Sequence, residues 1–197
     1  MPEARIVPPE ALATERLLLR KPRPEDAARI FATYAQDPEV VRYLTFLPHR
    51  NLKDTHEAFE RFLQNWRSGK SYSWLIFRRN DEQLVGAISA REDQGINLGY
   101  LLARPFWGQG FMSEALGAIV DWAFSVPSVF RVWAVCDLEN EASARLLERN
   151  GFNQEGILRN WSLHPNVSDT PRDCYCYAKT RRAPDRSSDS PAQTIRD

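Results

Sequence analysis

The sequence predicts one α/β domain in which helices cover both faces of a mixed sheet. Two patterns favour this architecture. Short apolar strand segments and amphipathic helical segments share the 197 residues, and three strand segments follow one another in the middle of the chain. The length is typical of one domain, which can bury well over half of the surface that its unfolded chain exposes. No internal repeat or linker divides the chain.

The N-terminal third is expected to hold one strand and three helices. Residues 1–13 contain three prolines and little pattern, so they are interpreted as a loose leader. Residues 16–20 have the pattern of a short strand. Three helical segments follow over residues 24–34, 37–43 and 53–66, and proline with acidic residues marks the start of the first two.

Three consecutive strands are predicted in the middle of the chain, over residues 72–78, 83–92 and 97–103. The third is apolar at nearly every position, as expected of a strand that is covered on both faces. Pro105 ends it, because proline has no backbone N–H to donate to a sheet. We therefore expect a meander at the centre of the sheet.

A glycine turn and an amphipathic helix come next. Gly108 and Gly110 let the backbone turn sharply and approach a ligand, and apolar residues then recur at helical spacing as far as Phe124. The first turn of a helix offers free N–H groups and the positive end of its dipole. No Lys or Arg lies between Pro105 and Trp122, so the backbone itself would hold an anion such as phosphate here. The alternative is a plain turn whose glycines serve only the chain reversal.

The last third is expected to hold a strand, a helix, two further strands and a tail. Asn140 is a plausible N-cap of the helix, and Gly151 is its stop. The predicted ranges are a strand over 130–136, a helix over 140–150, strands over 152–161 and 174–178, and a disordered tail over 181–197.

The composition argues against several classes of partner. Lys and Arg total 26, and Asp and Glu also total 26, so no bulk field favours nucleic acid or an anionic membrane. No apolar run approaches the roughly 20 residues of a transmembrane helix, and the first residues lack the apolar core of a signal peptide. Cys136, Cys174 and Cys176 do not have metal-ligand spacing. We expect a cytoplasmic protein with reduced thiols and no metal.

Four stretches occur in a specific order and spacing. They are TERLLLR (14–20), GY (99–100), WGQGF (107–111) with EAL (114–116), and NEAS (140–143) with NGF (150–152). Through them, residues 14–180 resemble the GNAT superfamily of N-acetyltransferases. Within it the chain is most similar to the RimJ/RimL type, which acetylates the N-terminal amines of ribosomal proteins. The resemblance implies a mostly antiparallel central sheet with one splayed parallel strand pair, flanked by helices on both faces.

The resemblance also implies a seat for acetyl-CoA, with its pyrophosphate on the glycine turn and its thioester in the wedge between the splayed strands. Trp107 stands where the superfamily usually has Arg or Gln, but it is common in the RimJ/RimL type. Met112 is larger than the usual residue, which matters little if only its N–H binds phosphate. The implied phosphate ligands are the amides of Gln109, Gly110, Phe111, Met112 and Ser113, and the pantetheine arm would follow the backbone of Leu101, Leu102 and Ala103 and the side chain of Asn140.

Aminolysis of a thioester needs a neutral amine, a stabilised oxyanion and a proton for the departing thiolate. Many superfamily members supply that proton from a tyrosine, at the position where this chain has Leu147, which cannot donate. Ser143 matches the serine that takes this role in the RimJ/RimL type. The alternative is that its hydroxyl only satisfies the helix terminus, and the capping role alone would likewise explain the presence of Asn140.

The acceptor side is less defined. Trp74, Glu92 and Trp161 are the candidate acceptor residues, although tryptophan more often packs in the core. Such aromatic residues would favour a peptide end or an amphipathic amine. No base is assigned, because Glu92, Asp93, Glu155 and His164 are better explained as solvated groups in loops or at strand ends.

The resemblance implies an enzyme that moves an acetyl group from acetyl-CoA to a primary amine by direct attack in a ternary complex. The acceptor is a protein N-terminal α-amine or a small-molecule amine. The alternative is a catalytically silent CoA-binding sensor or regulatory module, and Ser143 beside an intact glycine turn favours the enzyme. No nucleic acid or membrane partner is expected, and a homodimer is possible.

Overall fold

The computed structural model of the chain describes residues 6–181. Their first half contains four strands and three α-helices, the first of which continues as a π-helical turn. In order, these are β1 (Ala11–Ala13), β2 (Leu17–Arg20), α1 (Asp26–Ile30) with the π-helical turn (Phe31–Ala35), α2 (Pro38–Val41), α3 (Leu52–Ser68), β3 (Tyr72–Arg78) and β4 (Leu84–Glu92). The helices and strands predicted for this half are confirmed, and β1 is additional.

The second half completes an eight-stranded sheet with the strand order β1-β2-β3-β4-β5-β6-β8-β7. Each neighbouring pair is antiparallel except β5 and β6, which are parallel. The predicted mixed sheet is therefore confirmed. Its elements are β5 (Ile96–Leu102), a 3₁₀ turn (Arg104–Phe106), α4 (Phe111–Ser125), β6 (Arg131–Asp137), α5 (Glu141–Arg149), β7 (Asn153–Ser162) and β8 (Arg172–Thr180).

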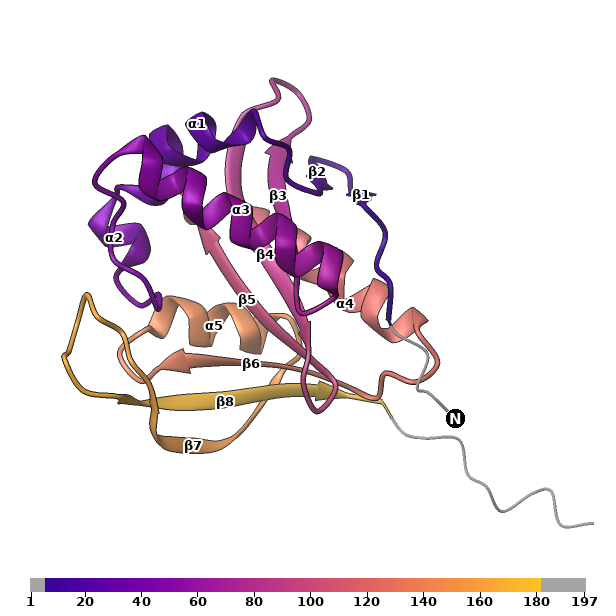
Figure 1. The fold of residues 1–197 in the computed structure, drawn as a ribbon. Helices are drawn as coiled ribbons and strands as arrows, with labels where there is room; N and C mark the ends of the chain where they lie inside the picture. Colours follow the sequence, from indigo (N-terminus) through magenta and orange to yellow (C-terminus); the bar gives the residue numbers. More distant parts are fainter. Residues whose placement is uncertain (1–5, 182–197) are drawn as a thin grey trace, which may run out of the picture.

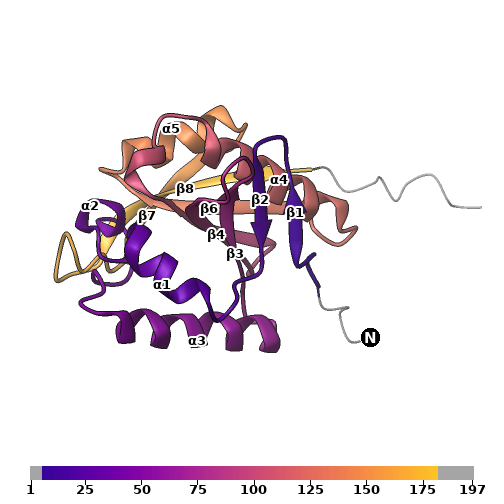
Figure 2. The ribbon, with the colours of Figure 1, turned by 90° about the horizontal axis from the view of Figure 1, so that it is seen from above.

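Helices cover both faces of this sheet. In Figure 1, α3 crosses in front of β3 and β4, and Figure 2 shows α1 and α3 on one side with α4 and α5 on the other. The apolar stripe of α4 is buried against the sheet, as its spacing predicted. Each Phe, Met, Leu, Ile or Val side chain in the stripe contributes about 1.5–3 kcal/mol when it leaves water. The buried members are Phe111, Met112, Ala115, Leu116, Ile119, Val120 and Ala123.

The segment before β2 packs on the domain, contrary to the expected loose leader. β1 pairs with β2, and the side chain of Ile6 is buried. The hydroxyl of Tyr72 donates to the carbonyl of Ile6 at 2.9 Å, and the indole N–H of Trp74 donates to the carbonyl of Pro9 at 2.9 Å. The expectation is therefore wrong for residues 6–13, because partners on β3, far along the chain, hold this segment.

β5 and β6 separate soon after they pair. They are joined only from Ile96 to Leu98, opposite residues 132–134, and Figure 1 shows the two strands diverging toward their C-terminal ends. From Gly99 onward β5 pairs with β4 alone. The prediction that this strand is covered on both faces is wrong for its second half, where the side chains are partly exposed.

At the C-terminal end of the domain, Arg181 is tied to the end of α4. Its guanidinium donates to the carbonyls of Phe124 and Val126, both at 2.9 Å, so the ordered fold extends at least to this residue. The predicted tail beyond it lies outside the described residues. No helix within residues 6–181 combines the length and the apolar character that crossing a membrane requires.

Candidate active site

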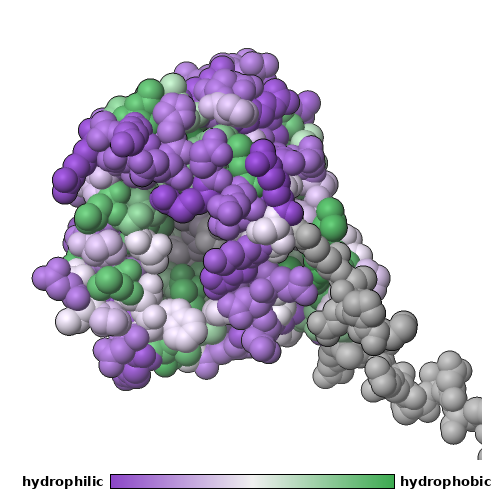
Figure 3. Space-filling model, in the orientation of Figure 1, coloured by the Kyte–Doolittle hydropathy of each residue, from purple (hydrophilic) through white to green (hydrophobic). Residues whose placement is uncertain are grey.

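A cavity of about 750 Å³ lies between α2, the end of β5, the glycine turn and α5. It is next to the gap that β5 and β6 leave as they separate. On the face drawn in Figure 3, the surface is hollowed below α3, over β5. The candidate residues that line the cavity are Leu101, Leu102, Gly110, Met112, Ser113, Asn140 and Ser143.

The glycine turn at one wall has the backbone conformation that its sequence predicted. Gly108 and Gly110 have φ of 73° and 79°, in the left-handed region that side chains rarely adopt. A Cβ on Gly110 would meet only the Arg16 guanidinium, at 3.4 Å, so conformation rather than crowding requires this glycine. Gly110 is also the N-cap residue of α4, where none of the described side chains caps the helix. The first N–H groups of α4 are therefore available to an anion.

The rim of the turn is braced by side chains. The indole N–H of Trp107 donates to the carbonyl of Leu102 at 2.6 Å, and the side-chain amide of Gln109 donates to the carbonyl of Pro105 at 2.8 Å. The exposed Trp107 thus ties the turn to the end of β5. This tie explains why a large aromatic residue fits where the family usually has Arg or Gln.

The backbone of β5 faces its two neighbours alternately. The N–H of Ala103 donates to the carbonyl of Val85 in β4 at 2.8 Å, and the register is regular from there to Ile96. In an antiparallel pair, successive residues direct their N–H and C=O groups to opposite sides. Leu101 and Ala103 therefore face β4, whereas Tyr100 and Leu102 face the gap. Of the three residues expected to pair with pantetheine, only Leu102 offers its backbone to that gap.

Across the cavity, the start of α5 holds Ser143. The side-chain oxygen of Asn140 accepts from the N–H of Ser143 at 3.2 Å, so Asn140 is the predicted cap. The hydroxyl of Ser143 is therefore not needed to cap the helix. It lies 2.7 Å from the hydroxyl of Tyr100 on β5. Burial raises the pKa of Tyr100 far above its ordinary value, although its bond with Ser143 opposes this, so Tyr100 stays protonated.

Tyr100 was missed as a site residue by the sequence argument, where it appeared only in the GY stretch. Arg145 and Arg149 were missed as well. They lie one turn apart on α5, and both line the cavity. Arg145 pairs with Glu141 at 2.8 Å, and Arg149 is exposed. Because these arginines come from a later helix, side-chain positive charge lies at the cavity in addition to the backbone groups that are expected to hold an anion.

The α2 end of the cavity carries charges of both signs. Glu39 and Glu139 line it together with Arg42 and Tyr43, and the carboxylate of Glu139 pairs with Arg172 at 2.8 Å. The hydroxyl of Tyr43 donates to the main-chain carbonyl of Glu139 at 3.3 Å. The only sequence signal for Glu39 and Glu139 was their position near the starts of α2 and α5, which says nothing about which cavity they face.

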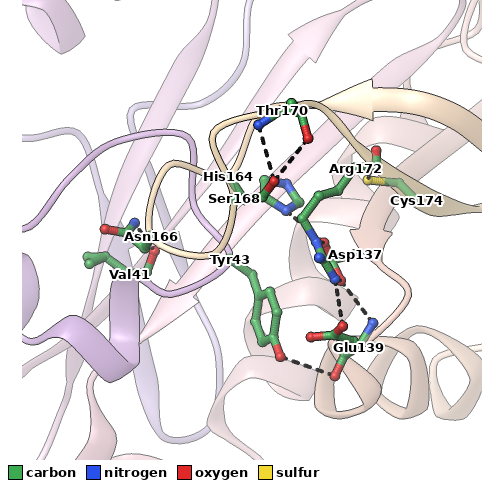
Figure 4. Close-up of polar contacts among 10 residues, drawn as sticks. All are labelled: Val41, Tyr43, Asp137, Glu139, His164, Asn166, Ser168, Thr170, Arg172 and Cys174. Carbon is green, nitrogen blue, oxygen red and sulfur yellow. Dashed lines mark hydrogen bonds and ion pairs between the residues drawn. The ribbon is translucent and has the colours of Figure 1, made fainter.

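A buried network holds the turn between β6 and α5 (Figure 4). Asp137, at the end of β6, accepts from the Nε of Arg172 at 2.5 Å and from the N–H of Glu139 at 2.9 Å. Nδ1 of His164 lies 3.0 Å from the same carboxylate. Burial alone would raise the pKa of Asp137, but these hydrogen bonds outweigh it and hold the pKa below its ordinary value.

The loop between β7 and β8 is fixed to the α2 side of the domain (Figure 4). The side-chain amide of Asn166 donates to the carbonyls of Val41 and Phe46, both at 2.8 Å. With His164 in the Asp137 network, the loop connects α2 to the turn that begins α5. The turn that precedes α5, and with it the cavity wall that carries Ser143, is therefore held in place by the loop between β7 and β8.

The groups considered as a base do not line the cavity. His164 is 5% exposed and in contact with Asp137, so its interpretation as a solvated loop residue is wrong. Glu155 forms an ion pair with Arg131 at the edge of the sheet. Asp93 lies in the turn after β4, where its carbonyl accepts from the indole of a β6 tryptophan.

The acceptor candidates are not gathered at the cavity either. Trp74 is 0% exposed and packs between Trp66 and Trp122, with ring centroids at 5.3 and 5.7 Å. It is a core residue and cannot touch an acceptor, so that prediction is wrong. Glu92 ends β4 and Trp161 lies on β7, and both are exposed outside the cavity lining.

Comparisons with known proteins agree with this geometry. A family model described as an acetyltransferase (GNAT) domain matches residues 16–153. The uncharacterized N-acetyltransferase YoaA of Bacillus subtilis (strain 168) is 32% identical over 174 residues, which cover 86% of this chain and 97% of YoaA. The ribosomal protein uS5-alanine N-acetyltransferase of Escherichia coli (strain K12) is 24% identical over 173 residues, covering 80% of this chain and 85% of that protein.

A solved structure supports the same fold. The microcin C7 self immunity acetyltransferase MccE, in complex with acetyl-CoA and AMP, has a TM-score of 0.78 at 20% identity, over 89% of this chain and 98% of that chain. The uS5-alanine enzyme confirms the resemblance to the RimJ/RimL type. The chain belongs to the GNAT acetyltransferase family, and it is an N-acetyltransferase that takes its acetyl group from acetyl-CoA.

Proposed function

We propose that this enzyme acetylates a primary amine by direct attack on acetyl-CoA in a ternary complex, with Ser143 as the general acid. The observation that carries the proposal is the Ser143 hydroxyl. It belongs to a cavity-lining residue, it is not the cap of its helix, and it is held 2.7 Å from the Tyr100 hydroxyl. A hydroxyl fixed in this way can protonate a leaving group as the bond to it breaks.

The proposed seat of acetyl-CoA follows the cavity wall. Its pyrophosphate would rest on the amides of residues 109–113, which the uncapped start of α4 supports. Its pantetheine amides would pair with backbone groups of Leu102 and Tyr100, the β5 residues that face the gap. Arg149 would add a side-chain charge near the phosphates. These residues fit a phosphorylated, amide-containing ligand.

The chemistry then needs few groups from the protein. The nitrogen of a neutral amine attacks the thioester carbon, and the C–S bond breaks as the tetrahedral intermediate collapses. The O–H bond of Ser143 breaks as an S–H bond forms on CoA. The proton that the nitrogen releases passes to water, since none of the groups considered as a base lines the cavity, and a proton that comes ultimately from solvent restores the Ser143 hydroxyl.

The acceptor is proposed to enter at the α2 end of the cavity. Glu39 lines this end beside Glu139, whose charge Arg172 balances, so the Glu39 carboxylate would attract an ammonium group before it loses its proton. One relative is named for alanine of ribosomal protein uS5, and one structural neighbour is a self immunity acetyltransferase in complex with acetyl-CoA and AMP. A protein N-terminus and a small-molecule amine therefore remain the two classes to test.

A panel of acceptors tests the proposal directly. The protein is incubated with acetyl-CoA and, separately, with peptides that have free N-termini, the same peptides with blocked N-termini, and small primary amines. Release of the CoA thiol is followed, and the products are identified by mass. Thiol release with acetylated product from free amines only is the expected result. Tight binding of acetyl-CoA without product from any amine would favour the silent CoA-binding module.

The proposal also covers the compartment in which the enzyme works and its assembly state. Cys136, Cys174 and Cys176 are free and buried, which is compatible with a reducing compartment such as the cytoplasm. The enzyme is proposed to work there on an amine acceptor, without nucleic acid or membrane, as a monomer or a homodimer. Sedimentation of the purified protein distinguishes the two assembly states.

A further inference from the structure

Tyr100 and Ser143 meet across the cavity from different elements. Tyr100 stands on β5, two residues after the last residue that pairs with β6, and Ser143 stands in the first turn of α5. Both residues line the cavity, and their hydroxyl oxygens are 2.7 Å apart. That separation is typical of a normal O–H···O hydrogen bond. The bond therefore bridges the two walls between which the thioester is proposed to lie.

The direction of this hydrogen bond follows from the groups around it. A serine hydroxyl has one hydrogen to give and two lone pairs to accept with. If Ser143 gives its hydrogen to sulfur, the bond from Tyr100 must be one in which the tyrosine donates. Burial keeps Tyr100 protonated, so it can donate at any working pH. The thiol of Cys136 is also within hydrogen-bonding reach of Ser143, but a thiol is a weak donor.

We propose that Tyr100 is a positioning residue that acts through Ser143 as a proton relay. This inference rests on the proposed role of Ser143 as the general acid. As the Ser143 O–H bond breaks and an S–H bond forms on CoA, the tyrosine O–H donates more strongly to the serine oxygen and passes its proton to it. Water then returns a proton to Tyr100. One proton leaves the amine nitrogen and one arrives on sulfur, so the sequence balances.

The relay also sets the geometry of Ser143. Without a partner, a serine side chain near a helix start rotates among its rotamers or bonds to its own backbone. The bond from Tyr100 selects the rotamer that faces β5, which is the wall proposed to hold the pantetheine arm. The other explanation is a structural one, in which the two hydroxyls merely join β5 to α5. The two explanations differ in what happens to turnover.

The test compares Tyr100→Phe with Tyr177→Phe. Tyr100→Phe removes the tyrosine hydroxyl that contacts Ser143 and keeps the aromatic ring. The second removes another buried tyrosine hydroxyl, which donates to Glu148 on the same helix at 2.9 Å and does not line the cavity. We expect Tyr100→Phe to lower kcat about 10- to 100-fold, in the range of acid–base contributions. The KM and Kd for acetyl-CoA should change by less than about twofold, and Tyr177→Phe should keep its kcat.

A double-mutant cycle adds a readout that a structural bond would not move. If Tyr100 acts through Ser143, adding Tyr100→Phe to Ser143→Ala should change kcat by less than about twofold. The relay would be overturned if the kcat losses of the two single variants multiplied in the double variant. So would full turnover in Tyr100→Phe with only a lower melting temperature, or an equal loss of kcat in Tyr177→Phe. Full turnover in Ser143→Ala with an impaired Tyr100→Phe would make Tyr100 act alone, which also contradicts the proposal.

One measurement needs no variant. In the wild-type enzyme, single-turnover acetyl transfer is timed in mixtures of H₂O and D₂O. A relay moves more than one proton in the step, so the rate should depend on the deuterium fraction along a curve. A straight line would contradict it. Failure of the wild-type enzyme to acetylate any amine would instead overturn the proposed function, and acetyl-CoA binding by calorimetry would show whether the site itself survives.

Discussion

Arg16, just before β2, and Glu114, in the first turn of α4, form an ion pair that fixes the glycine turn to the sheet. Nε of Arg16 lies 2.6 Å from Oε2 of Glu114, and the same guanidinium donates to the carbonyl of Gln109 at 3.1 Å. Burial alone would raise the pKa of Glu114, but hydrogen bonds from Thr14 and Arg16 outweigh it and lower the pKa. Two stretches that carry the family resemblance are therefore in direct contact.

Arg16→Gln should weaken acetyl-CoA binding at the glycine turn more than it lowers the stability of the fold. We expect the Kd for acetyl-CoA, measured by calorimetric titration, to rise about threefold to tenfold, because the phosphate-binding amides lose the brace on Gln109. The free energy of unfolding should fall by at most about 1 kcal/mol, since the Arg16 side chain is 44% exposed.

The matched control is Arg159→Gln. Arg159 pairs with Asp173 between β7 and β8, away from the cavity, and its side chain is 72% exposed. This change should leave the Kd for acetyl-CoA as it is in the wild type. Equal affinity losses in the two variants would mean that general charge, rather than the brace on the turn, attracts the ligand.

Gly110→Val should weaken acetyl-CoA binding by about 1–3 kcal/mol. The φ of 79° at this position is strained for a β-branched residue, and a side chain there would stand at the entrance to the amides of α4. Gly117→Ala is the control on the same helix, where a Cβ meets nothing within 4 Å. That change should raise the free energy of unfolding by about 0.5–1 kcal/mol and leave binding intact. Unchanged affinity in Gly110→Val would remove the glycine turn from the binding site.

Ser143→Ala should lower kcat on the order of 10²-fold, less if water substitutes, while the Kd for acetyl-CoA stays nearly the same. A hydroxyl that donates only as the C–S bond breaks contributes to the transition state rather than to binding. Steady-state kinetics and a thermal melt are run on the same sample. Asn140 remains to cap α5, so the melting temperature should change little. Normal turnover with a lower melting temperature would leave the acid unassigned.

Local signals in the sequence were enough to predict most elements and the glycine turn. Pro38 with Asp37 and the Gly110 turn mark where α2 and α4 begin, and the cap of α5 is satisfied by Asn140 as predicted. These features depend on residues within a few positions of one another. The splayed strand pair followed from the family resemblance, because no local pattern reports where β6 leaves β5.

The site was less predictable because its key contacts are distant in sequence. Tyr100 and Ser143 are brought together only by the packing of α5 over the gap. Trp74 is an aromatic residue of the kind that often lines a binding cleft, but the N-terminal segment and two other tryptophans bury it. His164 looked like a loop residue because its partner, Asp137, ends a strand much earlier in the chain. Such pairings depend on tertiary packing, which residue spacing alone does not encode.

The Asp137 network predicts how stability depends on pH. The folded-state pKa of Asp137 is lowered from an ordinary value of 3.8, so folding favours its ionised form. The stabilisation should be complete above about pH 5 and should be lost as the pH falls below about 4 through the folded-state pKa. Arg172, His164 and the N–H of Glu139 face this carboxylate and gain from its charge.

Asp137→Asn should therefore lower the free energy of unfolding by about 1–3 kcal/mol at pH 7, because buried donors lose a charged acceptor. The difference from wild type should shrink as the pH falls below about 4 toward the lowered folded-state pKa, because the wild-type carboxyl then becomes protonated, first in the unfolded chain. Other carboxylates with lowered pKa values, such as Asp26, titrate in both proteins and cancel in the difference. Asp121→Asn, at an exposed position on α4, is the control and should change stability little at either pH. Denaturant unfolding at several pH values measures each difference, and a gap between Asp137→Asn and wild type that stays constant from pH 7 to pH 3 would show that the charge of Asp137 does not stabilise the turn before α5.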